Sequence, residues 1–173
     1  RRIDDLGRVV IPKEIRRTMR IREGDPLEIF TDNDGEVVFK KYSPMGEMSP
    51  FASQYAEVMS RATGLSIIIC DRDRVVAAAG VNKKEFQDRR LSPAMEAAMD
   101  QRQTYVAKAG DQKRLQPVEN LDRYASIMVP IVAAGDVIGA VCFLMPDSGA
   151  IPTEGDVKLA QVAAAFLGKQ MEE

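Results

Sequence analysis

Four cations near the start of the chain recur at helical spacing and form a group of side chains suited to contact with phosphate groups. Lys13, Arg16, Arg17 and Arg20 stand at positions i, i+3, i+4 and i+7, which places all four on one face of a helix. No acidic residue lies at pairing distance on the same stripe. The spacing predicts a binding surface for a polyanion, and the alternative is a basic helix face that is only solvated.

The charge around this stripe is sorted along the sequence. The first 22 residues carry eight Lys or Arg against three Asp or Glu, and the next 17 carry six acids and no base. Arg1, Arg2 and Arg8 add positive charge from strands expected just before the helix. Because so short a segment cannot average out such a gradient, we expect its folded form to have one strongly positive face.

The residues that are missing exclude most catalytic chemistry. Without histidine there is no Ser-His-Asp or Cys-His arrangement, and two cysteines cannot supply a zinc site. Cys70 and Cys142 lie in apolar runs far apart in sequence, so we interpret them as core residues. The sequence therefore predicts no catalytic residue, no metal ligand and no cofactor, and a protein that is not an enzyme.

The elements expected to position the cations are a short helix and a hairpin. Pro12 suits a first helical position, and Ile15 and Met19 face away from the basic stripe. The segments 26–31 and 36–41 are predicted to form a β-hairpin around a turn at 32–35. About 42 residues with few apolar side chains are near the size at which a domain needs oligomerisation, so we expect a partner chain.

The run RRIDDLGRVVIPKEIRRTMRIREGDPLEIF resembles the DNA-binding domain of the AbrB transition-state regulator family. The resemblance implies a swapped-hairpin β-barrel formed by two chains, with surface arginines that contact DNA. The matching arginines are Arg1, Arg8, Arg16 and Arg17, and Arg2 stands where the family often has Lys. With Lys13 and Arg20 these make the predicted DNA-binding set. The sequence begins inside the family's first strand, so we expect a few residues before Arg1.

Residues 43–64 are predicted to be a linker and connecting helix. Pro50 suits the start of a helix, and apolar residues recur at spacings of three and four up to Gly64, including Phe51, Tyr55 and Val58. This stripe either packs on the sheet of its own domain or pairs with the same helix of another chain.

Residues 65–173 have the pattern of an α/β domain with a central antiparallel sheet. Strands are expected over 65–70, 74–79, 104–108, 124–133 and 137–145, with helices opening at Ser92-Pro93 and at Thr153. The last helix is apolar over so wide an arc that we expect it to contact both its own sheet and a helix of another subunit. The segment from Pro130 to Gly139 resembles the last hairpin of GAF domains.

The predicted fold class is therefore α+β with two domains, an AbrB-like head over 1–42 and a GAF-like domain over 65–173. Together the resemblances imply a DNA-binding transcription regulator of the kind that spore-forming bacteria use. The expected partners are double-stranded DNA, a second copy through the head to give a homodimer, and further copies to give a homotetramer.

The GAF-like domain is expected to sense a small molecule, to assemble subunits, or both, and its ligand, the DNA target and the direction of regulation stay open. No membrane span or signal sequence is visible, so the expected location is cytoplasmic.

Two other functions fit part of the pattern. A MazE-like antitoxin shares the type of head but has a short, disordered tail. The tail here is about 120 residues long, with turn-forming residues at regular intervals between its expected helices and strands. A GAF-type methionine sulfoxide reductase would need Cys70 and Cys142 to meet across neighbouring strands, and nothing near them in sequence would lower a thiol pKa.

Overall fold

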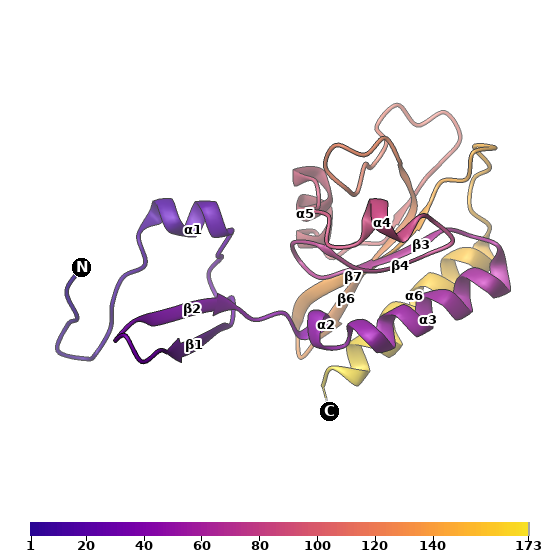
Figure 1. Cartoon of the computed structure of the whole chain (residues 1–173). Coiled ribbons are helices and arrows are strands. Elements are labelled where there is room, and N and C mark those ends of the chain that lie inside the picture. The colour runs from indigo at the N-terminus through magenta and orange to yellow at the C-terminus, as the bar shows by residue number, and fades with distance from the viewer. Residues whose placement is uncertain (173) are drawn as a thin grey trace. The chain divides into compact units, whose positions relative to one another are not determined.

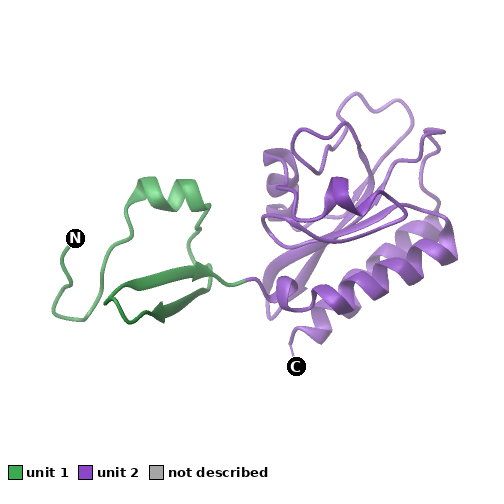
Figure 2. Ribbon diagram, in the orientation of Figure 1, with its two compact units in different colours: residues 1–42 green, residues 43–173 purple. Residues whose placement is uncertain are grey.

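The computed structural model describes residues 1–172. It divides into two compact units, residues 1–42 and residues 43–173 (Figure 2). Glu173, the last residue of the predicted GAF-like domain, lies outside the described residues. We refer to the two units as the head and the body.

The head contains one helix and one hairpin, α1 (Lys13–Met19), β1 (Leu27–Thr31) and β2 (Val37–Lys41) (Figure 1). The strands pair antiparallel from Leu27 opposite Lys41 to Thr31 opposite Val37. The side chain of Asp32 holds the turn by accepting the N–H groups of Asp34 at 3.0 Å and Glu36 at 2.8 Å, and Gly35 supplies the positive φ of 85° that the turn requires. The hairpin lies where the sequence predicts it.

Residues 1–12 depart from the expectation, since they contain no strand. A strand needs a neighbour to pair with its backbone groups, and in this single chain residues 1–12 have none, despite the β-branched residues Val9, Val10 and Ile11. The helix begins at Lys13, with Pro12 at its N-cap in an extended conformation. The helix therefore begins near Pro12, as the sequence predicts.

The body is built on a five-stranded antiparallel sheet. Its strands are β3 (Ile67–Cys70), β4 (Val75–Ala79), β5 (Tyr105–Val106), β6 (Ala125–Ala133) and β7 (Asp136–Leu144), in the order β4-β3-β7-β6-β5. Ala134 and Gly135 connect β6 to β7, and both have positive φ, which matches the twist of a tight hairpin. β5 is shorter than the predicted 104–108 strand.

Helices cover both faces of this sheet (Figure 1). One face carries α3 (Ser49–Thr63) and α6 (Glu154–Gln170), and the other carries the short α4 (Lys83–Phe86) and α5 (Pro93–Asp100). The alternation along β3 explains the two layers, because Ile67 and Ile69 belong to the core under α3 and α6 while Ile68 and Cys70 belong to the opposite core. The sequence did not predict α4 or α2 (Pro44–Glu47).

The two long helices approach the sheet through small residues. α3 buries Ala52, Ala56 and Met59, and α6 buries Ala160, Ala163, Ala164, Leu167 and Gly168. A β-carbon on Gly168 would lie only 2.3 Å from the carbonyl oxygen of Val132, so glycine is required for this approach. The connecting helix packs on its own sheet through these residues, whereas Phe51 and Val58 of the predicted apolar stripe stay exposed.

Candidate nucleic-acid interface

The helix α1 presents Lys13, Arg16 and Arg17 to solvent. They lie at i, i+3 and i+4, so the helix brings them together on one face. The same helix carries Ile15 and Met19, both of which are exposed in the single chain. A helix of seven residues with no buried side chain gains little from packing within this chain, so its apolar side remains to be covered.

Arg20 is not part of the helix, which corrects the expectation of a four-residue helical stripe. It has a left-handed backbone with φ 55° at the C-cap. The N–H of Ile21 donates to the carbonyl of Arg16 at 2.8 Å, and the N–H of Arg20 donates to that of Arg17 at 3.2 Å, a pattern that ends a helix. The ammonium group of Lys41 then donates to the carbonyl oxygen of Arg20 at 2.9 Å and places a cation at the negative end of the helix.

Arg8 belongs to a turn that its neighbour Asp4 organises. One carboxylate oxygen of Asp4 accepts the N–H groups of Leu6 at 3.0 Å and Arg8 at 2.8 Å, and the other accepts the Nε–H of Arg8 at 2.8 Å. These bonds from the backbone and side chain of Arg8 lower the pKa of Asp4. The Arg8 side chain is still 72% exposed, so it can contact a ligand while it remains paired.

The predicted DNA-binding cations differ in whether they form an ion pair. Arg8 is paired with Asp4, whereas no ion pair is found for Arg1, Arg2, Lys13, Arg16 or Arg17 within residues 1–172. Two acids of the head serve its turns, since Asp32 holds the hairpin and Asp25 accepts the N–H of Arg22 at 2.8 Å. The five cations are therefore available for an external anion.

Sequence reasoning missed two residues that support this surface. Asp4 shapes the turn before α1, and Lys41 caps the end of α1 from β2. An Asp four residues before an Arg, with Gly7 between them at φ 79°, is a local signal of such a turn. The contact of Lys41 with α1 spans 21 residues and has no comparable local signal.

The two thiols are buried in the body. Cys70 pairs with Ala140 and Cys142 with Ile68 on the adjacent strands β3 and β7, so they are diagonal neighbours in one core. Burial raises the pKa of Cys142 to about 12 and raises that of Cys70 well above its ordinary value. Because the thiolate is the reactive form, this pair is unsuited to redox catalysis.

The described residues contain no group of three or more His, Cys, Asp or Glu placed to hold a metal ion. A search of the same part of the chain finds no helix with the length and apolar character needed to span a bilayer.

Sequence relatives cover both units. The family profile described as "Stage V sporulation protein T C-terminal, transcription factor" matches residues 47–172, and the profile "Antidote-toxin recognition MazE, bacterial antitoxin" matches residues 1–46. Stage V sporulation protein T of Bacillus subtilis (strain 168) is 50% identical over 177 residues, covering 100% of this chain and 96% of the relative. Transition state regulatory protein AbrB of the same organism is 57% identical over 44 residues, covering 25% of this chain and 45% of the relative.

Solved structures give the fold of the body. A GAF domain/HD domain protein from Geobacter sulfurreducens has a TM-score of 0.52 at 16% identity, covering 75% of this chain and 93% of that one. A free methionine-R-sulfoxide reductase from Thermoplasma acidophilum has a TM-score of 0.56 at 11% identity, covering 73% and 94%. Likeness at such identity shows the fold and not the activity, and the buried thiols argue against the reductase.

The AbrB-like head, the GAF fold and the full-length relative agree with one another. The chain belongs to the stage V sporulation protein T family of transcription factors.

Proposed function

We propose that this transcription factor binds double-stranded DNA through the basic surface of a head formed by two chains. The observation that carries the proposal is that Lys13, Arg16 and Arg17 share one face of α1 and have no ion pair in the described residues. Arg1, Arg2, Arg8 and Arg20 complete the surface. Guanidinium and ammonium groups with no carboxylate partner release counterions when they contact phosphates, and this release favours binding.

The need for a second chain follows from the absence of a core in the head. None of residues 1–42 is buried, and large apolar side chains are exposed on both faces of the hairpin, with Ile29 64% and Phe30 49% exposed. Val10 and Leu6 are exposed as well. A second copy that covered these side chains would also offer backbone groups with which residues 1–12 could pair. This supports the swapped-hairpin dimer that the AbrB resemblance implies.

A second apolar surface, on the body, supports assembly beyond the dimer. The rings of Phe51 and Tyr55 on α3 contact Phe166 on α6, with centroids 6.1 Å and 5.7 Å apart. Next to them Val58 is 68% and Val162 59% exposed. Aliphatic and aromatic groups gathered in this way on two neighbouring helices suit packing against helices of another chain. Two head dimers joined through the bodies would form a homotetramer.

Two heads related by symmetry would meet DNA as a pair, which suits a two-fold symmetric site. Phosphate contacts fix the register of the protein, and arginine forks can also read guanine edges in the major groove. The head has no long recognition helix, so we expect the shape and deformability of the duplex to contribute strongly to target choice.

The test is fluorescence anisotropy with a labelled promoter fragment and the double variant Arg16→Ala, Arg17→Ala. Because a dimer would lose four phosphate contacts, we expect binding to weaken on the order of a hundredfold. The matched control is Lys84→Ala, Lys113→Ala, which removes two exposed cations from the body. Wild-type affinity in the head variant, or equal losses in both variants, would contradict the proposal.

A further inference from the structure

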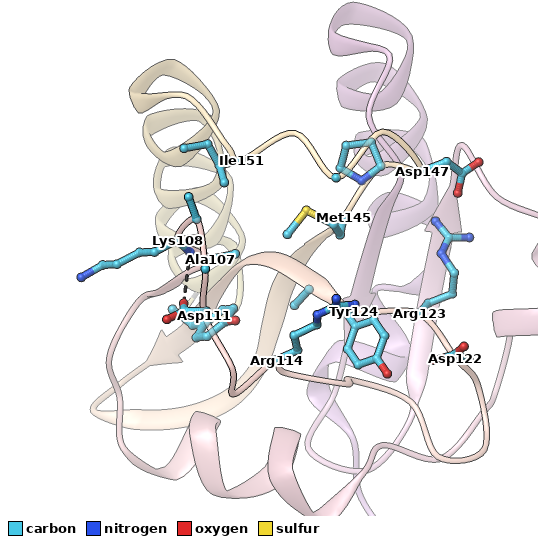
Figure 3. A pocket seen from close by; sticks show the side chains of 16 residues that line it. Ala107, Lys108, Asp111, Arg114, Asp122, Arg123, Tyr124, Met145, Asp147 and Ile151 are labelled. Atoms are coloured by element: carbon cyan, nitrogen blue, oxygen red, sulfur yellow. Dashed lines mark hydrogen bonds between the residues drawn. The ribbon is translucent and has the colours of Figure 1, made fainter.

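The body contains an open cavity of about 540 Å³ beside β5 (Figure 3). It lies between the loop that follows β5, the segment 122–125 that enters β6, and the segment 145–151 that follows β7. Its volume is within the range of about 300–1,000 Å³ that is usual for small-molecule sites. Nothing in the DNA-binding account uses these residues.

The cations of this cavity have no acidic partner. Lys108, Arg114 and Arg123 line it, and none makes an ion pair within the described chain. The guanidinium of Arg114 lies 4.9 Å from the ring centroid of Tyr124, and the two side chains lie against each other in Figure 3. The face of an aromatic ring attracts a guanidinium at this distance, and the N–H groups of Arg114 have no ion-pair partner.

Two of the three acids in the cavity have a hydrogen-bond partner other than its cationic groups. Asp111 accepts the backbone N–H of Lys108 at 3.1 Å, and a hydrogen bond with Asp122 raises the pKa of Tyr124. Asp147 lies on the same side of the cavity as Arg123 (Figure 3). Arg114 is therefore the cation best placed to take an anionic group.

Apolar side chains make up the remaining wall. Met145, Pro146 and Ile151 line the cavity together with the ring of Tyr105, and Ile151 is 52% exposed. An inorganic anion would leave these groups without contact, whereas an organic anion would cover them.

We propose that this cavity binds a small organic anion, whose carboxylate or phosphate group pairs with Arg114 and whose body packs on Tyr105, Met145 and Ile151. The inference goes beyond the proposed function and concerns the small molecule that the GAF-like domain is expected to sense. It adds the place and the chemical class of the ligand.

The cavity is connected through the chain to the helix that carries part of the proposed assembly surface. The segment 145–151 leads directly into Thr153, the N-cap of α6. A ligand that holds this segment acts on the helix whose outer face carries Val162 and Phe166.

The experiment is calorimetric titration of the full chain, at constant ionic strength, with adenosine 5′-monophosphate, citrate and uncharged adenosine. We expect saturable binding of at least one of the two anions and none of adenosine, and the anion that binds identifies a phosphate or a carboxylate ligand. Since a hydrogen bond to a charged group is lost, Arg114→Gln should weaken binding by about tenfold or more.

Two further variants keep the test decisive. Lys113→Gln removes a cation from the neighbouring position, which does not line the cavity, and should bind like wild type. Ile151→Glu should weaken binding by placing a like charge near the ligand. No binding of either anion, or equal binding by wild type and Arg114→Gln, overturns the inference. DNA binding, measured on the same samples, should stay unchanged in Arg114→Gln, so failure here is distinguishable from failure of the proposed function.

Discussion

The head and the body differ in where their apolar side chains lie. The body places them in two cores on opposite faces of one sheet, whereas the head leaves Ile29, Phe30 and Val38 exposed and buries no residue. Apolar burial is the dominant favourable contribution to folding. The comparison teaches that the body has cores of its own within one chain, and the exposed apolar side chains of the head support the proposed second copy.

The head and the body also differ in how their charged side chains are paired. In the body, Arg72 pairs with Asp100 and Lys83 with Glu57, while most of the predicted DNA-binding cations of the head have no acidic partner in the described chain. Exposed ion pairs contribute little to stability, so the contrast concerns binding more than folding. The unpaired cations of the head support the proposed contact with DNA.

The largest expected effect is on the reaction rate of the two thiols buried in the core of the body. Because burial raises the pKa of Cys142 to about 12, the native thiols should react with a disulfide reagent about a thousandfold more slowly than free cysteine at mildly alkaline pH. The measurement is thiol titration with and without guanidinium chloride. A cysteine introduced in the head by Asn33→Cys, at the exposed hairpin turn, should react quickly. A fast native thiol would contradict the account and favour redox chemistry.

The next effect tests the close contact of α6 with the sheet. Gly168→Ala forces a β-carbon against the carbonyl of Val132 and should lower the free energy of unfolding by about 3 kcal/mol. Gly155→Ala on the same helix is the control, since its β-carbon would approach nothing closer than 3.7 Å. Urea unfolding measures both. Similar stability of the two variants would mean that α6 packs less tightly than described.

A smaller effect is expected from an apolar residue of the head. Phe30→Ser should raise the dissociation constant of the head dimer by about tenfold or more, because the ring loses its burial between chains. Sedimentation equilibrium over a range of concentrations would show that tetramers of the variant dissociate into dimers at higher protein concentrations than the wild type does. Val132→Ser, at a partly exposed position on β6, should leave assembly unchanged. Identical curves for the two variants would count against the second chain as the cover of the hairpin.

The smallest effect is the titration of Asp4. Since Arg8 lowers the pKa of this exposed carboxyl, the ionised form favours the turn. Its contribution is complete above the pKa of the unfolded chain and is lost as pH falls through the lower folded value. Carboxyl NMR should show the midpoint moving up in Arg8→Gln and staying in place in Arg2→Gln. No movement in Arg8→Gln would remove Asp4 from the account of this turn.

Much of this architecture could be predicted because its signals are local. The turn at 32–35, the glycine that ends α3 at Gly64 and the cap of α6 at Thr153 all depend on residues within a few positions of one another. The strands β3 and β7 likewise follow from their own apolar runs, which are typical of buried strands.

The errors arise where the outcome depends on distant residues or on another chain. Val9, Val10 and Ile11 favour a strand but have no neighbour to pair with in a single chain. Arg20 continues the helical spacing, yet the backbone turns left-handed there, which spacing alone does not reveal. The cavity around Arg114 brings together three segments of the body, 105–114, 122–125 and 145–151, and no local pattern connects them.

The most direct test of the central claim is the salt dependence of DNA binding by the full chain. If two heads present about eight phosphate contacts, the logarithm of the binding constant should fall against the logarithm of salt concentration with a slope of around −7. The Arg16→Ala, Arg17→Ala variant should show about half that slope. A flat response in the wild-type protein would contradict the claim that these cations meet DNA on one shared surface.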